Sequence, residues 1–283
     1  MKILITGING QVGHALMQKL KGYELTGLTR QDCDLTNPDQ IKQVIDHHQP
    51  DLIINPAAYT KVDQAEGEPE LAFQINRDAP KVMADKAREY NIPFIHFSTD
   101  YVFDGEKEGA YVETDPTYPL SIYGKSKCAG EEAVEAVDGQ TYIFRTSWIY
   151  SNRGQNFYLT MKRLSHGHGA IKVVSDQVGV PTSSSFIAEQ IEKIIPQLSE
   201  NNTGLYHLTP QESCSWYDFA RQIIGKTNHD FNLKNLHPIA SHAFETKAQR
   251  PRHSLLNNQK IQQVFMLKFD HWHNGLDRII NEA

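Results

Sequence analysis

The sequence predicts an α/β protein with a Rossmann-like, doubly wound parallel sheet and a smaller C-terminal α/β substrate domain. Two observations indicate this class. The first half alternates short apolar runs with polar stretches whose apolar residues recur every three or four positions, as strands alternating with helices do. In addition, the first apolar run (2–6) leads directly into a glycine-rich turn (7–13). That order is typical of a dinucleotide-binding βαβ unit.

The expected elements follow from these patterns in chain order. The strand candidates of the first half are residues 2–6, 23–28, 51–55, 93–98 and 141–146. Helical spacing is clearest over residues 11–22, 69–90, 156–164 and 186–195, and a further strand is expected over 171–174. We therefore expect a dinucleotide-binding domain over residues 1–150, completed by about 170–200. Residues 151–283 would form mainly the substrate domain, with an interleaved boundary because no Pro/Gly/Ser-rich linker separates the two regions.

Composition excludes several classes of function. With 283 residues, 39% of them hydrophobic, the chain can bury a sizeable core, and it has no apolar run of about 18 residues. The start MKILITG reads as a strand rather than a signal peptide, so we expect a cytoplasmic protein without a membrane partner. The net charge of -6 argues against nucleic acid as the main partner. The three separated cysteines indicate reduced thiols, and the thirteen histidines show no metal-binding spacing, so no metal is expected.

The turn at residues 7–13 carries three glycines in the spacing G-x-x-G-x-x-G, at Gly7, Gly10 and Gly13. Glycine lets a phosphate approach the backbone closely, and the following helix offers free N–H groups and a partial positive charge. A glycine-rich turn without a ligand is common. Its position between a first strand and a helix nevertheless favours a bound dinucleotide.

The end of the second strand bears on which dinucleotide binds. An acidic residue there would accept hydrogen bonds from the adenosine ribose of NAD, but this strand ends in Thr29 and Arg30. Asp32 and Asp34 lie beyond the strand end. Arg30 could meet the 2′-phosphate of NADP or be an exposed loop arginine. We expect NADPH, with NADH possible.

The segment SIYGKSK places Tyr123 and Lys127 one turn apart if it is helical, and Thr99 and Asp100 end the fourth strand. Reduction of a ketone by hydride leaves an alkoxide, which a tyrosine hydroxyl can protonate. Lys127 would stabilise the resulting phenolate, and Thr99 would hold the carbonyl oxygen. Because a Y-x-x-x-K pair alone is common on solvated helix faces, the prediction depends on its combination with the glycine turn.

The segments TGINGQVG, DLTNP, NPAAYTKVDQAE, FSTDYVFDG, ETDPTYPLSIYGKSK and RTSWIY together resemble the extended short-chain dehydrogenase/reductases, most closely the dTDP-4-dehydrorhamnose reductase family. This resemblance spans nearly the whole chain. It implies NAD(P)H-dependent reduction of the 4-keto group of dTDP-4-dehydro-L-rhamnose to dTDP-L-rhamnose, a nucleotide sugar. The alternatives on the same scaffold are a nucleotide-sugar 4-epimerase or dehydratase, and a non-catalytic nucleotide-binding regulatory subunit.

The resemblance also implies roles for individual residues. Thr99, Tyr123 and Lys127 would be catalytic, and Thr99, Asp100 and Trp148 would contact the substrate. The implied cofactor-binding residues are Gly7, Asn9, Gly10, Gln11, Val12, Gly13, Arg30, Asp34, Leu35, Ala57, Ala58, Tyr59, Thr60, Tyr123 and Lys127. Two alternatives stay open: Trp148 could only fill the domain junction, and Asp34 could cap the helix that opens at 37–38.

The sequence departs from the family pattern at three positions. Some members form a dimer around a magnesium ion held by glutamates, where this chain has Ala15 and Ser185. We therefore expect no magnesium and favour a monomer, without excluding a dimer. Thr29 replaces an acid found in some relatives, which favours NADPH.

Overall fold

The computed structural model describes residues 1–167 and 169–282, and its main sheet has six parallel strands in the order β10-β5-β4-β3-β1-β2. The strands are β1 (Lys2–Thr6), β2 (Glu24–Leu28), β3 (Leu52–Asn55), β4 (Phe94–Thr99), β5 (Thr141–Thr146) and β10 (Gly204–His207). The predicted parallel α/β fold is confirmed, and β1 and β5 have the expected bounds. The edge strand β10 comes from the second half of the chain and pairs with β5.

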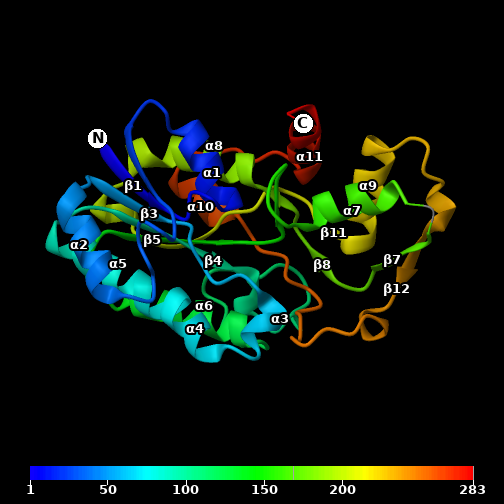
Figure 1. Ribbon diagram of the computed structural model, residues 1–283, viewed down its shortest axis with the longest axis horizontal. Helices are drawn as coiled ribbons and strands as arrows, with labels where there is room; N and C mark the ends of the chain where they lie inside the picture. The colour runs from blue at the N-terminus through cyan, green and yellow to red at the C-terminus, as the bar shows by residue number, and fades with distance from the viewer. Residues whose placement is uncertain (168, 283) are drawn as a thin grey trace.

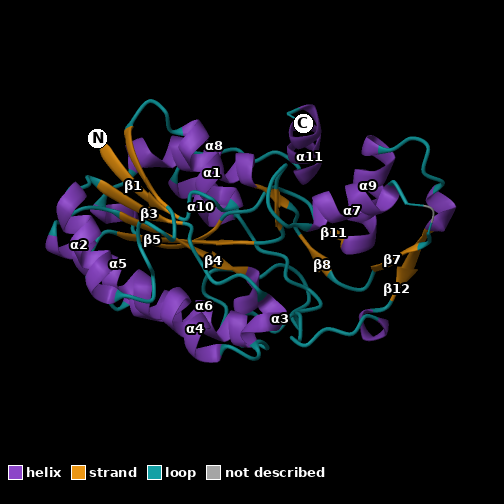
Figure 2. Cartoon of the chain, in the orientation of Figure 1, coloured by secondary structure: helices purple, strands orange, loops and turns teal. Residues whose placement is uncertain are grey.

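Helices cover both faces of this sheet (Figures 1 and 2). The side chains of Ile3 and Ile5 pack on one face and that of Leu4 on the other, because successive strand residues point to opposite sides. The first face is covered by α1 (Gln11–Lys19), α8 (Ser184–Ile194) and α10 (Gln259–Val264). The second face is covered by α2 (Pro38–His48), α5 (Ala79–Glu89) and α6 (Ile122–Glu135).

The chain order reverses direction across the sheet between β1 and β3. β2 lies on one side of β1, whereas β3, β4 and β5 follow on the other side. In open α/β sheets, ligands bind outside the carboxyl ends of the strands at such a switch point. Gly7 follows β1 there, and Ala57 comes two residues after β3.

The helix expected over 69–90 is divided into α4 (Pro69–Phe73), a π-helical turn (Gln74–Asp78) and α5. The cause of this interruption is Pro80. In a regular helix its ring would collide with the carbonyl of Asn76, four residues earlier. The turn directs the Asn76 amide inward, where it accepts from Tyr59 N (2.8 Å) and donates to Ser126 Oγ (2.9 Å). Asn76, in the π-helical turn, therefore connects the segment after β3 to α6 through these two hydrogen bonds.

Two glycines allow α6 to pack closely on its neighbours. A Cβ atom on Gly124 would lie 2.3 Å from the carbonyl oxygen of Tyr101, and one on Gly130 would lie 2.0 Å from that of Asn76. Any other residue at either position would therefore displace α6 from the helical turn Asp100–Val102 or from the π-helical turn. The positions of the side chains on α6 depend on this close packing.

The second lobe lies on the right of Figure 1 and has its own apolar core. Its helices are α7 (Phe157–Ser165), α9 (Trp216–Thr227) and α11 (Trp272–Asn281), and its strands are β6 (Ile149–Tyr150), β7 (Ile171–Val174), β8 (Val178–Gly179), β9 (Thr182–Ser183), β11 (Cys214–Ser215) and β12 (Leu236–Ile239). The shorter helical segments of the chain are α3 (Val62–Ala65), Asp100–Val102, Ile195–Gln197, Glu200–Asn202, Leu233–Asn235 and Ser241–Ala243. Among the described residues, no helix is both long and apolar enough to span a membrane.

Candidate active site

The glycine turn forms a cradle between β1 and α1. Gly7 has φ +60°, and a Cβ atom there would lie 2.9 Å from Ala57 Cβ. A Cβ atom on Gly13 would lie 2.3 Å from the Gly7 carbonyl oxygen, so the turn requires glycine at both positions. Gly10 is the N-cap of α1 and supplies no side-chain cap. The N–H groups of the first helical turn therefore face the position where an anionic group fits.

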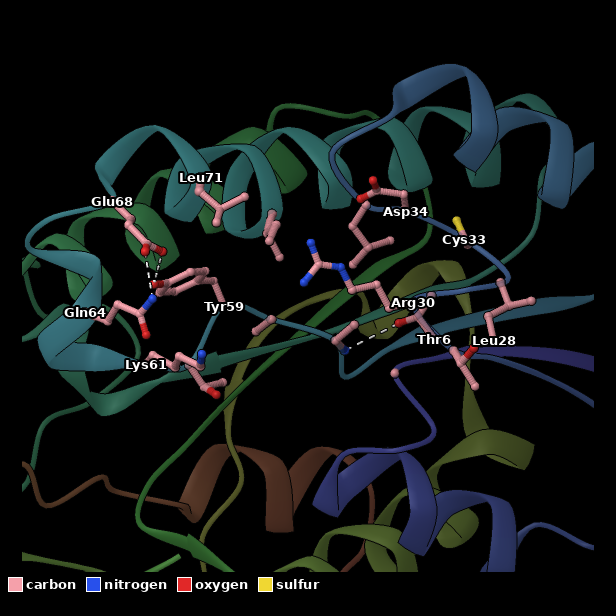
Figure 3. Close-up of a pocket in the computed structure, with 17 residues that line it drawn as sticks. Thr6, Leu28, Arg30, Cys33, Asp34, Tyr59, Lys61, Gln64, Glu68 and Leu71 are labelled. Atoms are coloured by element: carbon pink, nitrogen blue, oxygen red, sulfur yellow. Dashed lines mark hydrogen bonds between the residues drawn. The ribbon is translucent and has the colours of Figure 1, made fainter. Parts of the chain in front are cut away.

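A cavity of about 380 Å³ extends from this cradle past the end of β2 (Figure 3). It is lined by eight of the predicted cofactor residues: Gly7, Arg30, Asp34, Leu35, Ala57, Ala58, Tyr59 and Thr60. The side chain of Arg30 extends into the middle of the pocket. The other cofactor candidates lie outside this cavity, in the turn (Asn9, Gly10, Gln11, Val12, Gly13) and on α6 (Tyr123, Lys127).

The wall of the cavity opposite β2 was not predicted from the sequence. It includes Gln64, Glu68 and Leu71, from the region of α3 and α4. The Tyr59 hydroxyl donates to Glu68 Oε2 (2.6 Å), which fixes the ring of Tyr59 against this wall. The sequence gives no signal that residues of these short helices line the cavity, because their position depends on how the segment after β3 folds back.

The loop after β2 decides between two interpretations of Asp34. Asn37 caps α2, because its Oδ1 accepts from the backbone N–H groups of Asp39 and Gln40. The alternative in which Asp34 caps this helix is therefore wrong. Asp34 instead accepts from the backbone N–H and hydroxyl of Thr36, which lower its pKa and keep it ionised beside the cavity.

The predicted helix around SIYGKSK is confirmed as α6, which begins after its N-cap Ser121. It carries Tyr123 and Lys127 on one face, next to Thr99 at the end of β4. Burial raises the pKa of the Tyr123 hydroxyl above its ordinary value, and a hydrogen bond from Thr99 opposes this effect. Tyr123 is therefore a protonated acid in this structure. The ring of Tyr101 meets it edge to face, with centroids 5.5 Å apart.

Lys127 is almost fully buried and its ammonium group has fixed neighbours. Nζ donates to the carbonyl oxygen of Phe97 (2.6 Å) and lies 3.2 Å from His96 Nε2. Burial lowers the pKa of Lys127 to about 8, although Glu131 one turn along α6 favours the charged form. The direct partners of this ammonium group are thus on β4, a position that the sequence did not indicate.

Asp100 directly follows β4 and is also buried. It is 1% exposed, and burial raises its pKa to about 6 in spite of the hydrogen bond that its Oδ1 accepts from Thr99 Oγ1 (3.1 Å). Its Oδ2 atom has no hydrogen-bond partner among the described residues. Burying a carboxylate oxygen without a hydrogen-bond partner is unfavourable in free energy, and the hydroxyl of a ligand would supply the missing hydrogen bond.

Trp148 lies at the junction of the two lobes. Its backbone has φ +46°, an uncommon value for a large residue, and its ring stacks on Trp216 at 3.5 Å between centroids. A Cβ atom on Gly179 would lie 2.5 Å from the Trp148 ring, so this glycine provides the space for the indole. One face of the ring therefore contributes to the core of the second lobe.

The segment after residue 248 crosses from the second lobe to the region of α3. Arg250 donates to Asp63 Oδ2 (2.9 Å) and to the Tyr101 hydroxyl (3.3 Å). Arg250 here has a carboxylate and a phenol as partners, beside the rings of Tyr101 and Tyr123.

Comparison with known proteins gives consistent matches over the full length of the chain. The family model of the RmlD substrate binding domain matches residues 1–283. The chain is 39% identical to the dTDP-4-dehydrorhamnose reductase of Aggregatibacter actinomycetemcomitans, with 98% of each chain covered. It is 38% identical to that of Escherichia coli (strain K12), over 100% of this chain and 98% of the relative. A crystal structure of dTDP-4-dehydrorhamnose reductase from Bacillus anthracis in complex with NADP is 36% identical, has a TM-score of 0.94, and is matched over 100% of this chain and 99% of its own.

Proposed function

This chain belongs to the RmlD substrate binding domain family, that of the dTDP-4-dehydrorhamnose reductases, and we propose that it reduces the 4-keto group of dTDP-4-dehydro-L-rhamnose to dTDP-L-rhamnose with NADPH. The observation that carries the proposal is the cluster of Thr99, Asp100, Tyr123 and Lys127 near the carboxyl end of β4. It lies at the sheet edge where the glycine cradle also opens.

The bound nicotinamide would supply the hydride. Thr99 then donates a hydrogen bond to the carbonyl oxygen, and Tyr123 protonates that oxygen as negative charge develops on it. The raised pKa of Tyr123 keeps this proton in place before the reaction. Transfer is still favourable because an alkoxide is a much stronger base than a phenolate. Lys127 stabilises the phenolate that forms, and Asp100 accepts from a sugar hydroxyl.

The choice of NADPH is supported by two observations. Arg30 extends into the cavity that would hold the adenosine half of the cofactor, where a guanidinium can bind a 2′-phosphate. The relative from Bacillus anthracis, similar over the whole chain, is described in complex with NADP. Trp148 would offer the face not stacked on Trp216 as an apolar wall for the sugar.

Steady-state kinetics with purified protein tests this function directly. The loss of reduced-nicotinamide absorbance is measured with dTDP-4-dehydro-L-rhamnose generated in place, with NADPH and NADH in parallel reactions. We expect oxidation of the cofactor only when the sugar is present, with stoichiometric formation of dTDP-L-rhamnose. A protein that is isolated with bound NAD and interconverts sugars without net oxidation of the cofactor would instead be an epimerase, and the proposal would be withdrawn.

A further inference from the structure

A continuous line of buried polar side chains runs across three strands from Lys127 to the cofactor cradle. Lys127 Nζ lies 3.2 Å from His96 Nε2 on β4, and His96 Nδ1 lies 3.2 Å from the Asn55 amide on β3. Thr6 Oγ1 on β1 in turn donates to Asn55 Oδ1 (2.5 Å), so the structure sets the NH₂ group of Asn55 toward His96 Nδ1. These four residues are at most 2% exposed. Polar groups buried to this degree are normally fully paired, so the protons along the line have to be consistent with one another.

The proton count fixes one arrangement when Lys127 is charged. An ammonium group can only donate, so His96 must accept at Nε2. A neutral imidazole that accepts at Nε2 carries its proton on Nδ1, and Nδ1–H needs an acceptor. Asn55 provides one if its amide is turned by a half turn from the orientation in the structure, so that its carbonyl oxygen faces His96 and its NH₂ group faces Thr6. Nitrogen and oxygen of an amide exchange by a half turn, so the hydrogen-bond network decides the orientation.

The opposite arrangement is chemically distinct. If the NH₂ group of Asn55 faces His96 Nδ1, the ring proton sits on Nε2 and points at Lys127 Nζ. That is compatible only with a neutral amine at Lys127. The orientation of one buried amide is therefore tied to the charge of Lys127.

We propose that His96 is a positioning residue for Lys127, held by Asn55 in the tautomer with a proton on Nδ1, so that His96 Nε2 and the Phe97 carbonyl together orient the ammonium group. This inference rests on the proposed function, because it gives a role to Lys127 in the reduction. Two of the three ammonium hydrogens are then fixed on β4, and the third is left for the phenolate of Tyr123 and the cofactor.

His96 is suited to a fixed role rather than to proton transfer. Burial and the neighbouring ammonium group hold its pKa well below the ordinary value, so it stays neutral. The other ionisable groups around Lys127 are Tyr123 and Glu131 on α6, and Glu131 is paired with Arg145 on β5 (2.6 Å). His96 is the uncharged acceptor among them.

The tautomer can be read without any measurement of activity. Long-range ¹H–¹⁵N correlation spectra of ¹⁵N-histidine-labelled protein distinguish protonated from bare ring nitrogens, and His96→Gln assigns the signal. We expect Nδ1 protonated and Nε2 bare at neutral pH. A signal with the proton on Nε2 overturns the proposal, whether or not the protein reduces the sugar, so this result is separable from a failure of the proposed function.

The pH dependence of turnover gives the second test. His96→Phe removes the acceptor, which destabilises the charged form of Lys127 and lowers its pKa. The pH at which kcat falls on the alkaline side of its profile (the alkaline limb) is therefore expected to decrease by about one unit or more. That is the size expected when a charged group loses one hydrogen bond. His96→Gln keeps an acceptor and is expected to recover part of the shift.

His207→Phe is the matched control. His207 on β10 is equally buried and also held neutral, but its ring contacts the Asn257 carbonyl and the Phe103 ring rather than Lys127. We expect this variant to leave the alkaline limb in place. An unshifted limb in His96→Phe, or an equal shift in His207→Phe, would show that His96 has only a structural role.

Discussion

The two ends of the proposed site differ in how their polar groups are held. At the carboxyl end of β4, Thr99, Asp100 and Lys127 are 6%, 1% and 2% exposed. Thr99 donates to Asp100, and Lys127 on α6 donates to the Phe97 carbonyl of β4. At the end of β2, Arg30 is exposed, and the Asp34 carboxylate accepts from Thr36 of its own loop. The groups proposed to act on the reacting atoms are thus fixed before a ligand binds, whereas those proposed to select the cofactor can change without disturbing the core.

The largest expected effect of a single substitution is at the buried end. Tyr123→Phe retains the ring and its edge-to-face contact with Tyr101 but removes the proposed proton donor. We expect kcat to fall by roughly 10²–10⁴-fold, as for loss of a general acid, with little change in the KM for NADPH. The measurement is steady-state turnover with the 4-keto sugar.

Tyr101→Phe is the matched control for this prediction. It removes the neighbouring hydroxyl, which accepts from Arg250, and is expected to reduce kcat far less. If the two variants exchanged these effects, Tyr101 would be the proton donor and the assignment of Tyr123 would have to be withdrawn.

A medium effect is expected on the stability of the buried end. The pKa of Asp100 is raised to about 6, above the value of about 4 in an unfolded chain, so the folded protein binds this proton more tightly. Its contribution to stability is therefore present below about pH 4 and is lost as the pH rises through about 6. Denaturant unfolding measures the free energy of unfolding at each pH. In Asp100→Asn this loss of stability between about pH 4 and neutral pH should be absent, and its size is about 1–3 kcal/mol at neutral pH.

Asp138→Asn provides the control, since it removes an exposed carboxylate and leaves the buried end of the site intact. The same Asp100→Asn variant is expected to bind the sugar more weakly. Greater stability at neutral pH together with poorer binding would indicate that the buried carboxylate is retained for its ligand. An unaltered unfolding profile in Asp100→Asn would contradict this account of Asp100.

The contrast between the two ends also explains what could be predicted from the sequence. Strand ends, the glycine turn and the helix bearing Tyr123 and Lys127 are local patterns, and the structure has them at the expected positions. The π-helical turn had a local signal in Pro80, which the periodicity of the surrounding residues concealed. The role of Asp34 was left open between a cofactor contact and a helix cap, because that choice depends on the path of the loop.

Contacts between distant segments left no such local pattern. His96 and Asn55 are 41 residues apart, and Lys127 and His96 are 31 apart. A histidine inside an apolar strand reads as a core residue until the strand order places it beside a lysine. Trp216 likewise stacks on Trp148 across a sequence separation that no periodicity spans. These partners follow from the sheet order and from how the two lobes meet.

The smallest expected effect is at the exposed end and concerns cofactor choice. Arg30→Ala removes a cation from the cavity while leaving β2 and its packing intact. If Arg30 binds the 2′-phosphate, kcat/KM for NADPH should fall about tenfold, equivalent to about 1.4 kcal/mol, while that for NADH changes little. Lys61→Ala is the matched control, because Lys61 lines the same cavity beside Gln64, away from the end of β2. Equal losses with both cofactors in Arg30→Ala, or a change of preference in Lys61→Ala, would show that the 2′-phosphate is read elsewhere. A change of preference confined to Arg30→Ala would mean that cofactor choice rests on one exposed side chain, separate from the buried groups proposed to act on the reacting atoms.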